Sequence, residues 1–359
     1  MTLTQPTDAE ITAIGLAADL ATRVAGRTSP NPPVGAVVLD SEGRIVGEGA
    51  TQPAGQAHAE VMALQKAGSR AVGGTLVVTL EPCNHLGRTG PCTEAVIGAG
   101  IARVLYAVDD PNPVAAGGAQ RLREAGLQVL AGVEEAQVLR GALGPWRHAV
   151  TQARPFVTWK FAGTLDGRSA AEDGTSRWVS NPLSRADVHA LRDVVDAVLV
   201  GSGTVLMDDP QLTVRGVRGM AADELAERQP LRVVMDRRRR VPPEARVFDE
   251  TAETLVLDTA VPRFALKALF DRGVRHVLLE GGPTLAGAFL EARLVDQVVA
   301  YIAPKLLGAG LAVLQDAGIK TISQAVSLDI QDVQRLGDDL KIIATPVAAN
   351  AVEPAPRKD

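Results

Sequence analysis

The chain has 359 residues, of which 46% are hydrophobic and 3% aromatic, and its formal net charge at pH 7 is −5. This length exceeds what one hydrophobic core usually supports, so two domains are expected. The negative charge and the few aromatic stacking platforms argue against a nucleic-acid partner, and no apolar run is long enough to span a bilayer. Residues 1–8 lack the basic and apolar regions of a signal peptide, which favours a cytoplasmic protein.

The first part of the chain is predicted to alternate helices with strands. An amphipathic helix is expected over 7–23, with Thr7 or Asp8 as its cap, and a proline-rich loop leads into a buried strand at 34–39. The other predicted elements are strands at 44–48, 75–79, 103–108 and 127–130, helices at 58–67, 93–99 and 120–125, and a helical connector at 134–150. The helix at 58–67 is expected to turn Val61, Met62 and Leu64 inward. Such alternation predicts a layered α/β/α domain whose site lies at the strand ends.

One histidine and both cysteines of the chain form a pattern typical of a zinc site. His58 is followed two residues later by Glu60, while Cys83 follows Pro82 and a longer insert separates it from Cys92. An imidazole and two thiolates provide three ligands and leave the fourth tetrahedral position open, as in catalytic zinc sites. Zinc lowers the pKa of bound water from about 15.7 to about 7, and a carboxylate such as Glu60 then carries the proton to the leaving nitrogen. H-x-E followed by P-C and a second cysteine is the signature of zinc-dependent base deaminases.

Both halves of this pattern are expected at helix N-termini. There the first turn brings His58 and Glu60 to one site, and the helix dipole favours the Glu60 carboxylate. Two cysteines needed as thiolates imply no disulfide and a reducing cytoplasm. The alternatives are a structural zinc clamp, or two buried cysteines near an unrelated histidine. A clamp needs a fourth ligand, and His85 lies so close to Cys83 in the sequence that tetrahedral geometry would be strained.

The insert between the cysteines carries a resemblance to a known family. The stretch 82–92, which ends in Arg88-Thr89-Gly90-Pro91-Cys92, resembles the deaminase half of the bifunctional riboflavin-biosynthesis deaminase/reductase family. This resemblance implies a diaminopyrimidinone substrate with a phosphoribosylamino group, and it makes His85 and Arg88 candidates for contact with the ribose or phosphate. It also implies that Asn31 lines the pocket and that 109–113 closes the last active-site loop. For Asn31 the alternative is turn chemistry alone.

The second part of the chain contains two junctions of strand, glycine and helix. A predicted strand at 197–200 runs into Gly201-Ser202-Gly203-Thr204, and one at 277–279 runs into Glu280-Gly281-Gly282-Pro283-Thr284 and then a helix to residue 292. Glycines allow close backbone approach and helix N-termini offer free N–H groups, so both junctions suit a phosphate. Neither junction has the G-x-G-x-x-G sequence of a Rossmann unit, and each one alone is explained equally well by close packing of the backbone. Two such junctions in one α/β domain favour a bound nucleotide. The other predicted elements are strands at 154–162 and 233–236, a turn at 165–168, a helix at 184–194 and closing strands between 329 and 344.

These junctions and their neighbours resemble the reductase half of the same family. The matching motifs are Leu165-Asp166-Gly167-Arg168, Gly203-Thr204-Val205-Leu206 with Asp208-Asp209-Pro210, and Ala303-Pro304-Lys305. The resemblance runs from about Thr7 to Ala344 and implies a fold like dihydrofolate reductase and the use of NADPH. The implied cofactor contacts are Ala162, Trp178, Thr204, Asp208, Gly282, Pro283, Thr284, Leu285, Ala286, Gly287 and Ala288. The implied substrate contacts are Ser176, Arg192, Leu212, Arg215 and Glu280.

Elementary chemistry agrees with part of this assignment. Arg192 and Arg215 can clamp a phosphate bidentately, and Trp178 can stack on a flat ring. The alternative for each arginine is a surface ion pair. Arg237 stands where the family often has a serine that touches the cofactor, and it begins a run of arginines that ends at Arg240. This run favours a 2′-phosphate or, more simply, is a solvated basic turn.

We therefore expect an α/β protein of two domains, a cytidine-deaminase-like α/β/α domain at 1–148 and a dihydrofolate-reductase-like domain at 149–345, followed by a disordered tail at 346–359. The expected function is zinc-dependent deamination of 2,5-diamino-6-(5-phosphoribosylamino)pyrimidin-4(3H)-one, then NADPH-dependent reduction of the ribosyl group to ribityl. The expected partners are this small molecule and further copies of the chain, in a homodimer or higher homo-oligomer. Two alternatives stay open: a single-activity zinc nucleoside or base deaminase with a nucleotide-binding regulatory domain, and a non-enzymatic, zinc-stabilised binding module.

Overall fold

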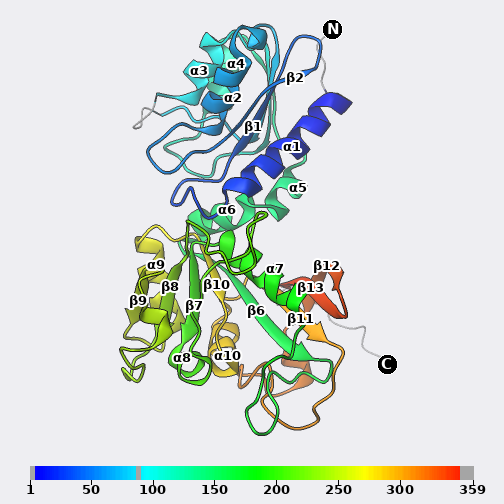
Figure 1. The fold of residues 1–359 in the computed structure, drawn as a ribbon. Coiled ribbons are helices and arrows are strands. Elements are labelled where there is room, and N and C mark those ends of the chain that lie inside the picture. Colours follow the sequence, from blue (N-terminus) through cyan, green and yellow to red (C-terminus); the bar gives the residue numbers. More distant parts are fainter. Residues whose placement is uncertain (1–4, 86–89, 348–359) are drawn as a thin grey trace, which may run out of the picture. The chain divides into compact units, whose positions relative to one another are not determined.

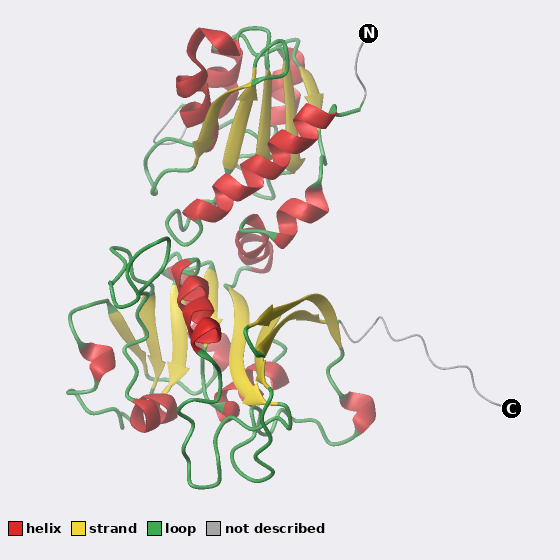
Figure 2. Ribbon diagram, turned by 45° about the vertical axis from the view of Figure 1, so that its right-hand side comes forward, coloured by secondary structure: helices red, strands yellow, loops and turns green. Residues whose placement is uncertain are grey.

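The chain forms two compact units in the computed structural model, which describes residues 5–85 and 90–347. The N-terminal unit ends at Pro155 and includes Leu269–Arg275, and the C-terminal unit comprises Phe156–Ala268 and the chain from His276 onwards. Each unit is built on a sheet of its own (Figure 2). None of the described helices is long and apolar enough to cross a membrane.

The N-terminal unit is a five-stranded sheet in the order β2-β1-β3-β4-β5, with helices on both faces. Figure 1 shows α2, α3 and α4 over one face and α1 with α5 over the other, which confirms the predicted α/β/α layering. Strand β1 is antiparallel to β2 and β3, whereas β3, β4 and β5 are parallel. The elements are α1 Asp8–Val24, β1 Gly35–Leu39, β2 Ile45–Ala50, α2 Ala59–Ala67, β3 Thr75–Leu80, α3 Cys92–Gly98, β4 Arg103–Val108, α4 Gly118–Glu124, β5 Gln128–Leu130, α5 Glu135–Arg140 and α6 Leu143–Gln152.

Helix α1 begins with the expected cap. The hydroxyl of Thr7 accepts a hydrogen bond from the backbone N–H of Glu10, and the Glu10 carboxylate accepts one from the backbone N–H of Thr7. The same carboxylate accepts a hydrogen bond of 2.7 Å from Nε of Arg103 on β4, where both side chains are buried. The cap therefore fixes the start of α1 and its position on the sheet together.

Helix α2 buries small side chains where the larger ones were expected. Its buried residues are Ala59, Glu60, Ala63, Leu64 and Ala67, whereas Val61 and Met62 are only half-buried. The reason is the close approach of α2 to β2: a Cβ added to Gly49 would lie 2.2 Å from the carbonyl oxygen of Ala59. Alanines therefore make up most of the face that meets β2. The prediction for Leu64 is confirmed, and that for Val61 and Met62 holds in part, since both are half-buried and Val61 packs against Cys83, Cys92 and Ala115.

Two further expectations need correction. The connector predicted at 134–150 is two helices, α5 and α6, because the chain leaves the helical conformation at Gly141, whose ψ is −155°. The disordered tail was predicted to begin at residue 346, but this residue, Pro346, still belongs to the last strand. The rest of the predicted tail, from 348 onwards, lies outside the described residues.

The C-terminal unit is built on an eight-stranded sheet in the order β12-β13-β11-β6-β10-β7-β8-β9. The strands from β11 to β9 are parallel to one another, and β12 and β13 form an antiparallel hairpin at one edge, with β13 antiparallel to β11. Its elements are β6 Phe156–Thr164, α7 Pro182–Asp193, β7 Ala197–Gly201, α8 Ser202–Asp208, β8 Leu231–Met235, β9 Thr254–Leu257, α9 Pro262–Asp271, β10 His276–Leu279, α10 Pro283–Glu291, β11 Gln297–Ala303, β12 Leu328–Leu336 and β13 Asp339–Pro346.

Candidate active sites

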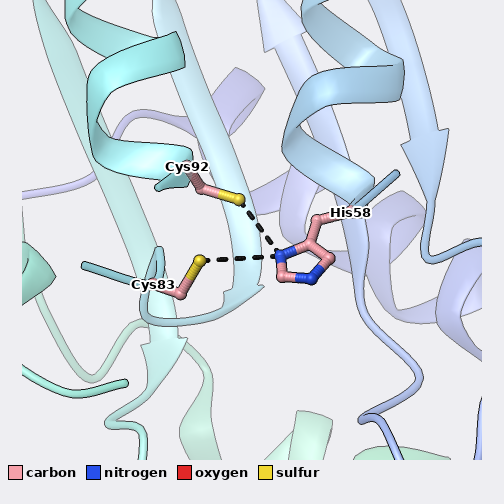
Figure 3. Close-up of side chains that lie close together, drawn as sticks. All are labelled: His58, Cys83 and Cys92. Atoms are coloured by element: carbon pink, nitrogen blue, oxygen red, sulfur yellow. Dashed lines mark hydrogen bonds between the residues drawn. The ribbon is translucent and has the colours of Figure 1, made fainter. Parts of the chain in front are cut away.

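His58, Cys83 and Cys92 lie together in the N-terminal unit, as Figure 3 shows. Nδ1 of His58 is 3.2 Å from Sγ of Cys92 and 3.6 Å from Sγ of Cys83. The three ligand atoms lie within 4.8 Å of one another, and both cysteines are buried. Among the described residues, this is the one group of three or more histidine, cysteine or acidic side chains close enough to share a metal ion.

Local structure explains why these side chains meet. His58 is the N-cap of α2 and Cys92 is the first residue of α3, so both lie at helix N-termini as predicted, while Cys83 follows the end of β3. The backbone N–H of Thr93 donates to the carbonyl oxygen of Cys83 at 3.3 Å, which ties the two cysteine segments together.

The loop that leads into α4 braces the Cys83 segment from the other side. A Cβ on Gly118 would lie 1.7 Å from the carbonyl oxygen of Pro82, so only glycine fits there. The buried Glu81 carboxylate accepts hydrogen bonds from the backbone N–H groups of Ala119, at 2.9 Å, and Asp110, at 3.3 Å. Glu81 thus anchors the loop over 109–118, a role that the sequence analysis did not assign.

The ionisable groups of this site perturb one another. Hydrogen bonds from Cys92 and His58 lower the pKa of the Cys83 thiol, which favours its thiolate form. The Glu60 carboxyl is 4% exposed and interacts with the Cys92 thiol. Burial raises the pKa of Glu60 to about 6, which brings it towards the operating range of a proton carrier.

The donor set fits a zinc ion. With zinc–sulfur and zinc–nitrogen bonds of about 2.3 and 2.0 Å, tetrahedral ligands stand roughly 3.5–3.8 Å apart. The observed separations of 3.2 and 3.6 Å between Nδ1 and the sulfurs are close to that range. His85 is not part of the group, which is consistent with three ligands and an open position rather than a closed clamp.

The remaining deaminase candidates are less defined. The backbone N–H of Asn31 donates to the carbonyl oxygen of Thr28, and its carbonyl oxygen accepts from the Thr28 hydroxyl, so the residue forms the turn considered as its alternative role. These bonds do not involve the side-chain amide of Asn31. Nδ1 of His85 is buried and has no hydrogen-bond partner among the described residues. Arg88 lies outside the described residues.

In the C-terminal unit the two glycine junctions meet. Strands β7 and β10 are parallel neighbours, so the segments that follow them emerge at the same edge of the sheet. The backbone N–H of Gly282 donates to Oγ1 of Thr204 at 3.1 Å, which joins the two junctions directly. A Cβ on Gly203 would meet no atom within 4 Å, so its backbone is open to a ligand. This edge has the open, N–H-rich backbone that a dinucleotide phosphate needs.

The predicted cofactor run 282–288 is the start of α10, and its residues face different ways. Gly282 is the N-cap, and Pro283 occupies the first helical position. Ala286 and Gly287 are buried, and a Cβ on Gly287 would lie 1.9 Å from the carbonyl oxygen of Gln315. The structure therefore places the N-terminal part of the run, Gly282 to Thr284, at the strand ends, and uses its later part for packing.

The substrate candidates Arg192 and Glu280 form a buried ion pair. Nε and Nη2 of Arg192 donate to the two carboxylate oxygens of Glu280 at 2.6 and 2.9 Å. Burial acts to raise the pKa of Glu280, but the charges of Arg192 and Lys160 outweigh it and hold the pKa at about 2. Nη1 of Arg192 donates to the carbonyl oxygen of Thr213 at 3.0 Å. Each nitrogen of the Arg192 guanidinium thus donates a hydrogen bond within this cluster. The phosphate clamp of Arg192 and Arg215 stays a prediction.

Lys160 and His189 belong to the same cluster, although the sequence analysis named neither. Nζ of Lys160 on β6 lies 3.7 Å from Oε2 of Glu280, and burial lowers the pKa of Lys160. Nδ1 of His189 lies 3.0 Å from the carbonyl oxygen of Thr213, which can only accept, so Nδ1 carries the hydrogen. Burial and the charge of Arg192 lower the pKa of His189 to about 4, so its ring is neutral at pH 7. The position of Lys160 in a strand of apolar residues was the one available signal.

The other reductase candidates lie at different places. Ala162 pairs with Tyr301 across β6 and β11, and Asp208 ends α8, where its carbonyl oxygen accepts a hydrogen bond from Arg177 at 2.8 Å.

Trp178 is 62% exposed, and the Arg185 guanidinium lies 4.4 Å from its ring centroid, so the arginine occupies part of its stacking surface. The carbonyl oxygen of Ser176 accepts a hydrogen bond from the backbone N–H of Val179 at 2.8 Å. Leu212 is buried with a φ of 55°.

The arginine run at 237–240 is exposed and follows β8. Its turn is closed by Asp236, whose carboxylate accepts from the backbone N–H of Val241 at 2.9 Å. Nη2 of Arg240 donates to Oγ of Ser202 at 2.8 Å, which brings the end of the run to the β7–α8 junction. The solvated turn weighed in the sequence analysis thus describes most of this run.

Comparisons with known proteins give a match for each half of the chain. Residues 9–108 match the family described as cytidine and deoxycytidylate deaminase zinc-binding region, and residues 155–342 match the RibD C-terminal domain. The riboflavin biosynthesis protein RibD of Mycobacterium tuberculosis is 51% identical over 328 residues, which cover 91% of this chain and 95% of that protein. The Escherichia coli protein of the same name is 40% identical, with 89% and 95% covered.

A solved structure shows the same fold over nearly the whole chain. The diaminohydroxyphosphoribosylaminopyrimidine deaminase/5-amino-6-(5-phosphoribosylamino)uracil reductase of Thermotoga maritima superposes with a TM-score of 0.86 at 36% identity, and the match covers 94% of this chain and 99% of that one. The metal-binding geometry, the paired junctions and this coverage in both halves lead to one conclusion. The chain belongs to the RibD family, the bifunctional enzymes of riboflavin biosynthesis that join a zinc-dependent deaminase to an NADPH-dependent reductase.

Proposed function

We propose that the N-terminal unit deaminates 2,5-diamino-6-(5-phosphoribosylamino)pyrimidin-4(3H)-one, and that the C-terminal unit then reduces the ribosyl group of the product to ribityl. The observation that carries the first step is the group of His58, Cys83 and Cys92, with the buried Glu60 beside Cys92. The second step is supported by the joined glycine junctions of β7 and β10 next to the Glu280 cluster.

In the deaminase site, His58, Cys83 and Cys92 would hold zinc through Nδ1 and the two sulfurs. Zinc, when bound, would supply a water whose pKa is lowered to about 7. Glu60 is the carboxylate that would take up a proton at this site and return it to the ring nitrogen and the departing amino group. Its burial keeps the proton from exchanging with bulk solvent, because the carboxyl is 4% exposed. Asn31 and His85 are assigned to the substrate ring and its ribose phosphate.

In the reductase site, NADPH supplies the hydride, and the residues of the chain bind and orient. The backbone around Gly203, Thr204 and Gly282 would hold the dinucleotide phosphates, with Ala162, Trp178 and Asp208 as further contacts. Arg215 binds the substrate phosphate. The ion pair of Arg192 and Glu280, whose charges offset each other, would contact the sugar from a fixed position. Ser176 and Leu212 complete the substrate contacts.

We assign the deaminase to residues 1–148 and the reductase to 149–345. The division of the structure after Pro155 and the matched stretches 9–108 and 155–342 support this assignment to within the length of α6. We also assign the enzyme to the cytoplasm, because both cysteines are free and needed as ligands.

The enzyme is further proposed to form a homo-oligomer. The β12–β13 hairpin at the sheet edge exposes 60% of Ile330 and 53% of Val333, and Ile322 nearby is 90% exposed. An exposed apolar edge strand can pair with the same strand of a second copy in a symmetric dimer, so a second copy of the chain is the proposed occupant.

A coupled assay tests the proposed function. The full chain is given the diaminopyrimidinone ribosylamine phosphate and NADPH, and ammonia release and NADPH absorbance are followed together. The proposal predicts that ammonia appears first and that NADPH is consumed only afterwards. Ammonia without NADPH consumption would instead support a single-activity deaminase with a regulatory nucleotide-binding domain.

A further inference from the structure

A chain of hydrogen bonds joins a buried arginine of the C-terminal unit to the candidate phosphate ligand Arg215. Nη1 of Arg232 donates to Oδ1 of Asp249 at 2.8 Å, and Nε2 of Gln211 donates to Oδ2 of the same carboxylate at 2.9 Å. Nη2 of Arg215 then donates to Oε1 of Gln211 at 2.6 Å. The route thus runs from the core to the site through two side chains.

The inner end of this route is fixed. Arg232 lies on β8 and is 0% exposed. Its Nη2 donates to the backbone carbonyl oxygens of Asp249 and Ala252 at 2.6 and 2.5 Å, in addition to the bond from Nη1 to the Asp249 carboxylate. A buried guanidinium cannot leave these partners without the cost of an uncompensated charge. Asp249 therefore occupies one position.

The Asp249 carboxylate also decides how the Gln211 amide is oriented. A carboxylate can only accept hydrogen bonds, and an arginine can only donate them. The amide nitrogen of Gln211 must therefore face Asp249, and its oxygen must face Arg215. The reverse orientation would bring two acceptors together on one side and two donors on the other. The direction of this series of hydrogen bonds is thus set by its charged ends, Asp249 and Arg215.

The backbone holds Gln211 in place as well. Nη1 of Arg232 lies 3.3 Å from the carbonyl oxygen of Gln211, and the next residue, Leu212, is buried with a φ of 55°. Beyond it, Oγ1 of Thr213 accepts from Nη2 of Arg215 at 2.8 Å. Both hydrogens of Nη2 are then used for positioning. Nε of Arg215 has no hydrogen-bond partner among the described residues.

We propose that Gln211 is a positioning residue for Arg215, and that through it the buried pair of Arg232 and Asp249 sets the affinity of the reductase site for the phosphate of its substrate. The inference rests on the proposed function, in which Arg215 contacts that phosphate. An arginine that is held before the substrate arrives loses less rotamer freedom on binding. Gln211 therefore acts on phosphate binding and not on hydride transfer.

Four variants of the full-length enzyme test this inference: Gln211→Met, Arg215→Met, the double variant, and Gln120→Met as matched control. Gln120 donates its amide N–H to the carboxylate of Glu124 at 2.8 Å on the exposed face of α4, so the control loses the same type of bond with no arginine attached. The readouts are the dissociation constant of ribose 5-phosphate, the KM and kcat for the pre-deaminated substrate, the KM for its dephosphorylated form, and the melting temperature.

Gln211→Met is expected to weaken the binding of ribose 5-phosphate about tenfold and to raise KM for the phosphorylated substrate by a similar factor. Its kcat should stay within about twofold of that of the unaltered enzyme. The KM for the dephosphorylated form stays unchanged, and the double variant binds no more weakly than Arg215→Met alone, because Gln211 acts only through Arg215. If Gln211→Met unfolds the unit, Gln211→Asn, which keeps the amide but is too short to reach both partners, takes its place with the same expectation.

Two results would overturn the inference in different ways. If Arg215→Met weakens binding and Gln211→Met does not, or if their effects simply add, Gln211 does not position Arg215 while the proposed function stands. If Arg215→Met leaves the affinity for ribose 5-phosphate unchanged, the assignment of Arg215 in the proposed function falls, and this inference falls with it.

Discussion

Arg192 and Glu280 hold each other at two points, with Nε to Oε1 at 2.6 Å and Nη2 to Oε2 at 2.9 Å. The two residues come from α7 and from the segment after β10, so the pair joins elements that are distant in the sequence. A bidentate carboxylate occupies one whole edge of the guanidinium, so the pair fixes the orientation of both side chains.

The stability of this pair should depend on pH. The pKa of Glu280 is held at about 2, below its ordinary value of 4.5, so the stabilisation is fully present above the ordinary value and is lost as the pH falls towards 2. Glu280→Gln is expected to lower the free energy of unfolding of the C-terminal unit by about 3 kcal/mol at pH 7 and by less at pH 3, where part of the stabilisation is already lost. Urea denaturation at pH 7 and pH 3 measures the difference. Glu253→Gln, at an exposed position of the same unit, is the control and should show no such trend.

Gly118 tests whether the loop before α4 positions the Cys83 segment. A Cβ at this position would lie 1.7 Å from the carbonyl oxygen of Pro82, so Gly118→Ala must displace the residue next to a metal ligand. We expect about 1–3 kcal/mol of destabilisation and a loss of zinc content, measured by metal analysis of the purified protein. Gly98→Ala, where a Cβ would meet no atom within 4 Å, is the matched control. Full zinc content in Gly118→Ala would show that the loop does not constrain the site.

Removal of zinc should separate activity from folding. Cys83 and Cys92 pack with Ala115 in a small cluster apart from the main hydrophobic core of the N-terminal unit. A chelator is therefore expected to abolish ammonia release while the circular dichroism spectrum and the reduction of pre-deaminated substrate persist. A loss of secondary structure that parallels the loss of zinc would indicate the structural, non-enzymatic module instead.

The exposed hairpin offers a test of self-association. Ile330→Lys combined with Val333→Lys places two charges on the edge β12 and is expected to reduce the mass measured by light scattering to that of the monomer. Val72→Lys changes a valine of the N-terminal unit that is 64% exposed and should leave the mass unchanged. An unchanged mass in the hairpin variant would show that the copies associate elsewhere, or that the enzyme is monomeric.

Much of the deaminase site could be predicted from the sequence, because its ligands lie at element ends that local patterns mark. His58 and Cys92 begin helices, and Cys83 follows an apolar strand. The inward face of α2 was predicted only in part, because periodicity selects large apolar residues and does not reveal how closely the glycines of β2 let the helix approach.

The reductase site was less accessible to such reasoning. Its motifs located Glu280 and Arg192 separately, but their pairing depends on how β10 and α7 pack, which no local pattern contains. Lys160 reads as an ordinary strand residue until the fold places it 3.7 Å from Glu280. The role of Gln211 depends on Asp249 and on Arg232, which are distant in the sequence and meet only in the folded unit.

Glu60→Gln tests the central claim of two independent sites on one chain most directly. The amide keeps the size of the side chain but cannot accept and return a proton, so deamination should fall by at least about 10³-fold. Zinc content and NADPH-dependent reduction of pre-deaminated substrate should match the unaltered enzyme, as they should in the control Glu94→Gln, an exposed residue in the first turn of α3. Loss of both activities together, or retention of deamination, would contradict the account.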